Sequence, residues 1–163
     1  MKVKTLDELL VHELKDLYNA ENRILKALPK MAEAASDPEL QKAFRDHLEE
    51  TRGQVSRLEK IFEGLDYEPG GQKCEASEGL IAEGDEIIKE LDKGAVRDAA
   101  LIGAAQRVEH YEMAGYGTAR TYAQILGKKE AMRLLQETLD QEGEANKKLN
   151  ALAQRINQKA LSA

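Results

Sequence analysis

The sequence predicts an all-α fold, a bundle of four long helices, and two observations support this prediction. Charged residues make up 33% of the 163-residue chain and aromatic residues 4%, with three prolines and no tryptophan; such a composition favours long helices over sheet. Apolar residues also recur at alternating steps of three and four positions along four long segments, as on the buried face of a bundle helix. We expect a single domain, residues 1–163, with a sizeable core.

The first two helices should form an antiparallel hairpin. A capping-box sequence opens the first helix at Thr5. This helix should continue to about Ala35 and kink at Pro29, which interrupts it. A capping residue followed by Pro38 then begins the second helix, which should end near Leu65.

A crossover should join this hairpin to a second one. The segment 64–77 contains glycines and a proline and predicts irregular backbone, after which Ser77 can cap a short helix over roughly residues 78–91. A third long helix is expected over residues 95–127, and a tight turn at residues 127–129 leads into the fourth. Two antiparallel hairpins joined by a crossover that contains a short helix are typical of the ferritin-like four-helix bundle.

Composition also excludes several classes of protein. The net charge of −6 disfavours binding to nucleic acid or to an anionic membrane. The single cysteine, Cys74, cannot form an internal disulfide and fits a reducing compartment. No apolar run approaches the roughly 20 residues needed to span a bilayer, and the N-terminus lacks the apolar segment of a secretory signal. We therefore expect a cytoplasmic protein.

Two glutamates interrupt the apolar face of the third long helix. Glu109 and Glu112 lie in the series Ile102, Ala105, Glu109, Glu112, Tyr116, Ala119, Ala123 and Leu126, whose spacing is that of a buried helix face. An unpaired buried carboxylate is very costly. A proton, a cationic side chain such as arginine, or a metal ion must therefore compensate these two groups.

The other three long helices show the same anomaly. Glu21 replaces an apolar residue on the first, and Glu142 does so on the fourth. The second has a polar band from His47 to Gln54, with Glu50 on its flank. Folding the chain at the two hairpin turns brings these acids to one level along the bundle, so we expect one carboxylate layer.

A carboxylate-rich layer inside a four-helix bundle is typical of di-iron and di-manganese proteins. Oxygen donors together with imidazole favour Fe or Mn. We therefore expect two divalent ions, Fe or Mn, whose charge nearly balances five carboxylates. The expected ligands are Glu21, Glu50, Glu109, Glu112 and Glu142. His47 is either a sixth ligand or a core histidine bonded to an acid of a helix.

Other interpretations remain open at the level of the sequence. The acids could form salt bridges with Arg23, Arg107 or Lys147, which would make the protein a metal-free structural or interaction protein. On the fourth helix, Glu137 or Glu144 could replace Glu142, because both step onto its inner flank. Glu142 is the preferred ligand, because it lies on the apolar face itself.

Three strings of residues resemble a known family. They are ALPKMA at 27–32, HLEET at 47–51 and QRVEHYE at 106–112, and they are similar to the YciE/YciF family of bacterial ferritin-like proteins. The resemblance covers nearly the whole chain. It implies a ferritin-like bundle, frequent dimerisation and association with stress responses, and it implies no established reaction. On this basis we expect a homodimer.

A more distant resemblance is to the rubrerythrins. Glu109 and Glu112 match the Glu-x-x-Glu motif of their third helix, and Glu21 matches the glutamate of their first helix. Gly53 and Ala145 stand where that family has the histidines of its Glu-x-x-His motifs. The resemblance therefore does not extend to rubrerythrin-like peroxidase chemistry.

Overall fold

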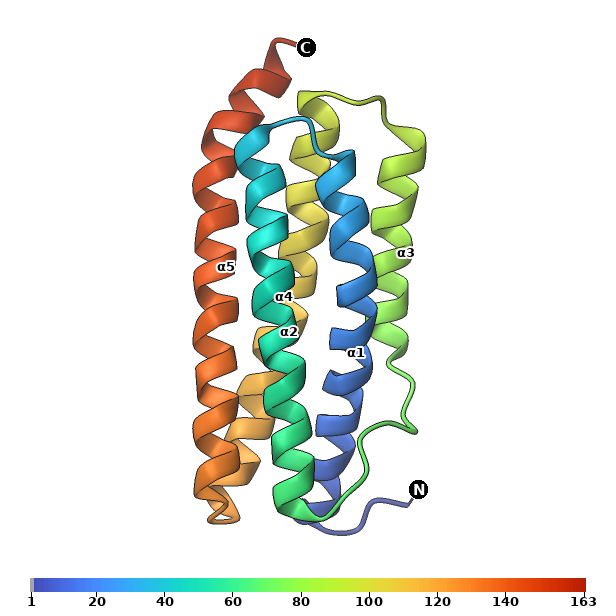
Figure 1. Ribbon diagram of the computed structural model, residues 1–163. Coiled ribbons are helices and arrows are strands. Elements are labelled where there is room, and N and C mark those ends of the chain that lie inside the picture. The colour runs from blue at the N-terminus through green and yellow to red at the C-terminus, as the bar shows by residue number, and fades with distance from the viewer. Residues whose placement is uncertain (1) are drawn as a thin grey trace.

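The computed structural model describes residues 2–163, which form five helices and no strand (Figure 1). Four are long: α1 (Leu6–Ala34), α2 (Pro38–Leu65), α4 (Ala95–Ile125) and α5 (Lys129–Leu161). The fifth, α3 (Glu75–Glu90), is shorter. The prediction of an all-α fold with four long helices and one short helix is confirmed.

The long helices pack as two neighbouring pairs. Helix α1 lies against α2 and α4 lies against α5, and the pairs meet where α2 contacts α5 and α1 contacts α4. Helix α2 ends at the opposite end of the molecule from the start of α4, and α3 returns the chain between them (Figure 1). On its way α3 packs against α1 and α4, so it covers the line where those two meet.

The starts of α1 and α3 show where a local sequence signal predicts the first residue of a helix correctly and where it does not. Thr5 caps α1 as expected: its hydroxyl accepts a hydrogen bond from the Glu8 backbone N–H at 3.2 Å, and the Glu8 carboxylate accepts one from the Thr5 N–H at 3.1 Å. The prediction that Ser77 caps the short helix was wrong, because α3 begins at Glu75 with Cys74 as its N-cap. A distant contact fixes this start, since Asn19 of α1 accepts a hydrogen bond from the Cys74 N–H at 2.9 Å.

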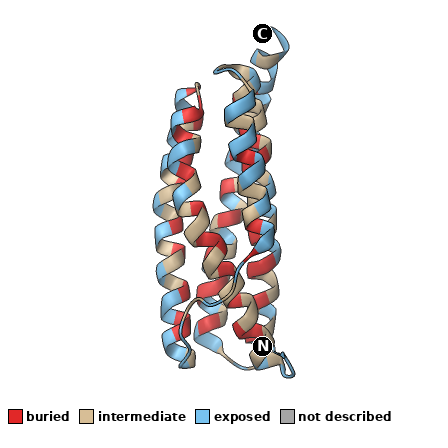
Figure 2. Cartoon of the chain, turned by 90° about the vertical axis from the view of Figure 1, so that its right-hand side faces the viewer, coloured by how far each residue is buried: buried red, intermediate tan, exposed pale blue. Residues whose placement is uncertain are grey.

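The core consists of two apolar clusters with polar side chains between them. One cluster lies where the start of α1 meets the end of α2, and it contains Leu10, Leu14, Leu17, Leu58, Ile61 and Phe62. The other lies where the end of α1 meets the start of α2, and it contains Ile24, Leu28, Leu40, Phe44, Leu101 and Ile102. Buried residues recur along the faces that the helices turn toward one another (Figure 2).

The turn between α1 and α2 is attached to both helices of the other pair. The two carboxylate oxygens of Asp98 on α4 accept hydrogen bonds from the backbone N–H groups of Ser36 and Asp37, each at 2.8 Å. Arg155 on α5 donates two hydrogen bonds to the Asp37 carboxylate, at 2.5 and 2.9 Å. This end of the molecule therefore fixes the height of α1 and α2 relative to α4 and α5.

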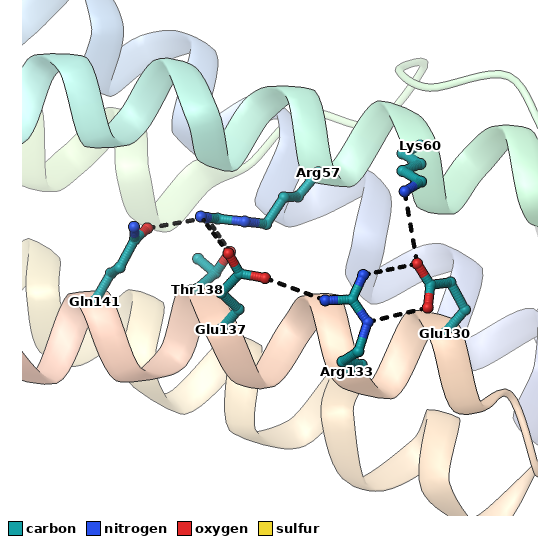
Figure 3. A network of polar contacts seen from close by, with 7 residues as sticks. All are labelled: Arg57, Lys60, Glu130, Arg133, Glu137, Thr138 and Gln141. Carbon is teal, nitrogen blue, oxygen red and sulfur yellow. Dashed lines mark hydrogen bonds and ion pairs between the residues drawn. The ribbon is translucent and has the colours of Figure 1, made fainter.

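A polar network joins α2 to α5 closer to the other end (Figure 3). The Arg57 guanidinium donates to Gln141 at 2.9 Å, to Thr138 at 3.2 Å and to Glu137 at 3.0 Å. Beyond it, Glu130 pairs with Lys60 at 3.6 Å and with Arg133 at 2.8 Å. Exposed pairs of this kind contribute little stability individually, but they fix the register of the two helices.

No helix within residues 2–163 has both the length and the apolar composition that a membrane span requires.

The ion pair between Asp37 and Arg155 should make the protein sensitive to acid. The Arg155 guanidinium holds the pKa of the Asp37 carboxyl well below its ordinary value. A carboxyl whose pKa is lowered by folding stabilises the protein above its unfolded-state pKa of about 4, and this contribution is lost as the pH falls further. We expect Asp37→Asn to lower the free energy of unfolding by about 1 kcal/mol at neutral pH, and by less in acid. Urea unfolding across pH measures both effects.

The matched control is Asp85→Asn, which removes one partner of an exposed ion pair with Lys30, 3.9 Å long. It should leave stability nearly unchanged at every pH. Equal losses in the two variants would contradict the role given to Asp37.

Candidate metal centre

Four buried side chains from three helices converge between the two apolar clusters. His47 comes from α2, Glu109 and Glu112 come from α4, and Glu142 comes from α5. One potential ligand atom from each lies within 4.8 Å of those of the other three. Such a set can hold a metal ion, since carboxylate oxygen and imidazole nitrogen are both common metal ligands.

Helical spacing places these groups on the inner faces. Glu109 and Glu112 are three positions apart on α4, so they project in similar directions. The buried residues Ala105 and Tyr116 continue the same face on either side of them. Glu142 likewise lies on the buried face of α5. The residues of this face are Leu135, Thr138, Glu142, Ala145 and Leu149. The carboxyl groups are therefore buried because the helix faces that bear them are buried.

Two carboxylates hold the imidazole ring of His47. Nδ1 lies 3.1 Å from Oε2 of Glu50, and Nε2 lies 3.1 Å from Oε1 of Glu109 and 3.8 Å from Oε2 of Glu142. The bond from Nδ1 to Glu50 fixes the ring so that Nε2 faces the other carboxyls. A carboxylate behind a histidine has this orienting role in many metal sites.

Glu21 of α1 lies beside the four-residue cluster. Its Oε1 accepts a hydrogen bond of 2.5 Å from the Tyr116 hydroxyl, and its carboxyl group lies against that of Glu112. Gly115 allows this approach of α1 to α4, because a Cβ atom there would lie 2.7 Å from Cδ2 of Leu17. A larger residue at position 115 would force the two helices apart or displace Leu17.

Several buried oxygen atoms in this region lack a hydrogen bond. Both carboxyl oxygens of Glu112 and of Glu142 have no partner among residues 2–163, and neither does Oε2 of Glu21 or of Glu109. Buried polar atoms in native proteins are normally satisfied. The unsatisfied atoms face one another, so cations placed among them would provide the missing partners. The residues present therefore fit a metal centre.

Without a metal, protonation must lower the negative charge. Burial raises the pKa of Glu112 and of Glu142 well above their ordinary value, and the neighbouring carboxylates raise both further. Burial also raises the pKa of Glu21 to about 7, although the hydrogen bond from Tyr116 opposes it. The metal-free centre therefore keeps protons on carboxyl groups that are ionised in the unfolded chain at neutral pH.

His47 and Glu109 form the charged part of the metal-free centre. Burial alone would lower the pKa of His47, but its hydrogen bonds with Glu109 and Glu50 raise it well above the ordinary value. Burial alone would raise the pKa of Glu109, but its contacts with Glu142 and His47 bring it below the ordinary value. The pair is thus an imidazolium and a carboxylate in direct contact.

The structure brings together most of the residues that the sequence singled out. Glu109, Glu112, Glu142 and His47 form the cluster, and Glu21 adjoins it. Glu50 lies outside, behind His47, with its side chain 35% exposed. The assignment of these six residues as metal ligands stays a prediction.

The alternative acids and cations on the helices have other partners. Glu137 accepts a hydrogen bond from Arg57, and Glu144 pairs with Lys147 at 2.6 Å near the surface. Arg23 donates a hydrogen bond to Asn19 at 3.0 Å, and its nearest acidic partner in an ion pair is Glu78 of α3, at 3.9 Å. Glu142 is accordingly the acid that α5 contributes to the cluster, and neither Arg23 nor Lys147 compensates it.

Sequence reasoning missed the supporting role of two residues. Glu50 is predicted as a ligand like the other acids, but its position three residues after His47 on one helix places it against the imidazole. Gly115 drew no attention, although a glycine inside a long helix often marks a close approach. Both residues act by positioning the groups that form the cluster.

The fold and the cluster define an all-helical protein with a buried His/Glu site that can hold a metal ion. The sequence matches the family described as "Domain of unknown function (DUF892)" over residues 5–162. The chain belongs to this family. Protein YciF of Escherichia coli (strain K12) is 46% identical over 162 residues, which cover 98% of each chain.

Solved structures show the same fold. The crystal structure of the E. coli stress protein YciF matches with a TM-score of 0.93 at 46% identity, over 96% of this chain and 99% of that one. YcfI from Rhodopseudomonas palustris, whose description proposes a structural role, matches with a TM-score of 0.88 at 45% identity, over 91% and 95% of the two chains. A protein from Xanthomonas campestris, 23% identical with a TM-score of 0.79, shows the fold alone. The resemblance to the YciE/YciF family is confirmed.

Ionisation of the buried carboxyl groups should destabilise the metal-free protein at alkaline pH. A carboxyl whose pKa is raised by folding stabilises the native state below its unfolded-state pKa, and this contribution is lost as the pH rises toward the folded-state pKa. Replacing Glu112 by glutamine removes the ionisable group and keeps its shape. We expect Glu112→Gln to raise the free energy of unfolding of metal-free protein at about pH 8 by at least about 1 kcal/mol, since one pKa unit corresponds to about 1.4 kcal/mol.

The advantage of Glu112→Gln should shrink toward acidic pH, where wild-type Glu112 is protonated in both states. The control is Glu144→Gln on the exposed side of α5, where no change is expected. Urea unfolding in the presence of a chelator measures both variants. A destabilised Glu112→Gln at alkaline pH would contradict the protonation of Glu112.

Metal binding should release protons. Carboxyl groups and imidazole must lose their protons before they can bind a cation, so the affinity should rise with pH. We expect Mn(II) to bind more tightly at about pH 8 than at about pH 6, with more protons released at the lower pH. Calorimetric titrations in buffers of different ionisation enthalpy count these protons. An affinity that does not change with pH would contradict the protonated state of the metal-free centre.

Proposed function

We propose that this chain is a ferritin-like, stress-associated protein that binds a dinuclear Fe or Mn centre between its four long helices. The observation that supports this most strongly is the convergence of buried carboxyl oxygens without hydrogen-bond partners, with His47 among them. The association with stress rests on the E. coli relative, which is described as a stress protein. The arrangement of two helix pairs with a crossover helix fits the ferritin-like class.

Charge supports two metal ions rather than one. Glu21, Glu109, Glu112 and Glu142 are buried, and when ionised they carry four negative charges. Two divalent cations would neutralise them fully, and His47 would then bind as a neutral ligand. With a single divalent cation, two of the four carboxyl groups would have to stay protonated, as in the metal-free centre.

The chain gives each residue a distinct role in this proposal. Glu109, Glu112 and Glu142 would bind the metals directly, His47 would bind through Nε2, and Glu50 would hold its ring. Glu21 would reach the same centre from α1, with Tyr116 fixing its orientation. Reduced Fe or Mn ions here would supply two electrons, which with two protons reduce dioxygen to hydrogen peroxide or hydrogen peroxide to water.

A structural or interaction protein is the second candidate. The proposed structural role of the R. palustris relative favours it. In this case the chain would be a helical homodimer, and the cluster would stay protonated and metal-free. The two candidates differ in their response to a chelator, because a ligand that binds only the folded state raises the melting temperature. Removing a native metal should lower the Tm, whereas a metal-free protein should not respond.

Metal content provides the direct test. We expect untagged protein from cells supplied with iron and manganese to contain about two Fe or Mn ions per chain, as in other dinuclear bundle proteins. Glu109→Ala should lose them, because it removes a buried carboxylate that faces His47 and Glu142. Glu144→Ala serves as the control and should keep them. Mass spectrometry of the three purified proteins measures the ratio.

A small amount of metal that is equal in all three proteins would contradict the dinuclear centre. It would favour the structural candidate, which sedimentation measurements of the dimer would then examine.

A further inference from the structure

A small apolar cavity lies beneath α3 and ends at the candidate metal centre. Its volume is about 30 Å³. Helices α1, α3 and α4 form its sides, with side chains that include Ile24, Leu28, Ile81, Ile88, Ala105 and Val108. His47 and Glu109 close its inner end. These are the same two residues whose side chains lie 3.1 Å apart in the candidate metal centre.

Size and lining together define what the cavity can hold. One water-sized sphere needs about 10–15 Å³, so the space suits a molecule of about two heavy atoms. Its walls are almost entirely hydrocarbon, and its polar lining is confined to His47, Asp85 and Glu109. A buried water needs several polar partners, whereas small apolar molecules enter cavities of this kind. The occupant that fits is an apolar diatomic gas, and dioxygen is the one that reduced Fe or Mn can reduce.

A second cavity reaches the same two residues from the other side. It measures about 20 Å³ and lies among α1, α2, α4 and α5, with Glu50 and Lys148 in its lining. Ionic groups at this position suit cations, water and hydrogen peroxide better than an apolar gas. Both cavities are lined by His47 and Glu109, and the second differs from the first by the two charged side chains in its lining.

Helix α3 forms the outer wall of the apolar cavity. Gly84 of α3 is buried and lines it, and a Cβ atom built there would meet no other atom within 4 Å. A larger side chain at this lining position would therefore meet no protein atom at its Cβ. At the outer edge, Asp85 of α3 forms a long ion pair with Lys30 of α1, at 3.9 Å.

We propose that the cavity beneath α3 binds dioxygen and delivers it to the candidate metal centre at His47 and Glu109. The site needs no polar recognition, because its size and its dry walls select the ligand. The reaction of dioxygen at the metal centre rests on the proposed function, whereas its binding in the cavity does not. Binding to the cavity can therefore be tested on metal-free protein.

Xenon is the probe for binding. It is apolar and occupies dry protein cavities. In crystals of metal-free wild-type protein under xenon pressure, we expect one xenon atom between Ile81 and Val108. Gly84→Leu should remove it, since the leucine side chain fills the cavity. Gly79→Leu is the matched control on the same helix, because Gly79 is exposed and its Cβ position is also free. This variant should keep the xenon.

Ala27→Leu narrows the same cavity from α1 and tests the proposal independently of position 84. Xenon that is absent from the wild type, or that persists in both filled variants, would overturn the proposal.

Delivery is tested with Fe(II)-loaded protein. We expect Gly84→Leu and Ala27→Leu to oxidise bound Fe(II) with dioxygen several-fold more slowly than wild type, and Gly79→Leu to match wild type. Hydrogen peroxide, which is polar, should oxidise all four proteins at similar rates. Stopped-flow absorbance measures these rates. Equal rates with dioxygen would overturn delivery through the cavity.

The two proposals fail in different ways. Wild-type protein that binds no Fe(II) would contradict the metal centre, and xenon occupancy would then still decide whether the cavity is a gas-binding site. Wild-type protein that binds Fe(II), with xenon absent from the cavity, would contradict this inference alone.

Discussion

The burial of four glutamate carboxyl groups between two apolar clusters is the constraint on which the rest of the structure depends. Each of these groups would be strongly destabilising as an unpaired ion. The structure reduces this cost with a hydrogen bond from Tyr116 to Glu21 and with the imidazolium of His47 beside Glu109. The apolar clusters above and below must supply the stability that the central layer lacks. A protein that needed only to fold would have placed leucine at these positions.

The central layer is therefore best understood as a functional departure from local folding rules. Buried polar groups that no protein atom satisfies are expected at sites adapted to bind something. Supporting contacts keep the layer rigid: Glu50 orients His47, and the absence of a side chain at Gly115 lets α1 approach α4. At the nearest hairpin turn, Asp98 and Arg155 fix the height of the helices that bear the acids.

Helix periodicity predicted most of the centre, because Glu21, Glu109, Glu112 and Glu142 occupy positions that must face inward once each helix packs. Periodicity could not place Glu50, since a side chain on the flank of a helix turns toward whichever partner is closest, here His47. The start of α3 was missed because a distant residue, Asn19, fixes Cys74. The cavity beneath α3 depends on how the side chains of three helices interlock. No pattern within a single helix contains that information.

The cluster draws its members from α2, α4 and α5, and Glu21 of α1 adjoins it. Neither helix pair alone contains the whole set. During synthesis the first pair can form while the second is still inside the ribosome, but the centre cannot assemble until Glu142 has emerged. The complete cluster therefore exists only once α5 has packed against the other long helices. A chain without α5 would lack Glu142 and would leave uncovered the faces of α2 and α4 that pack against α5.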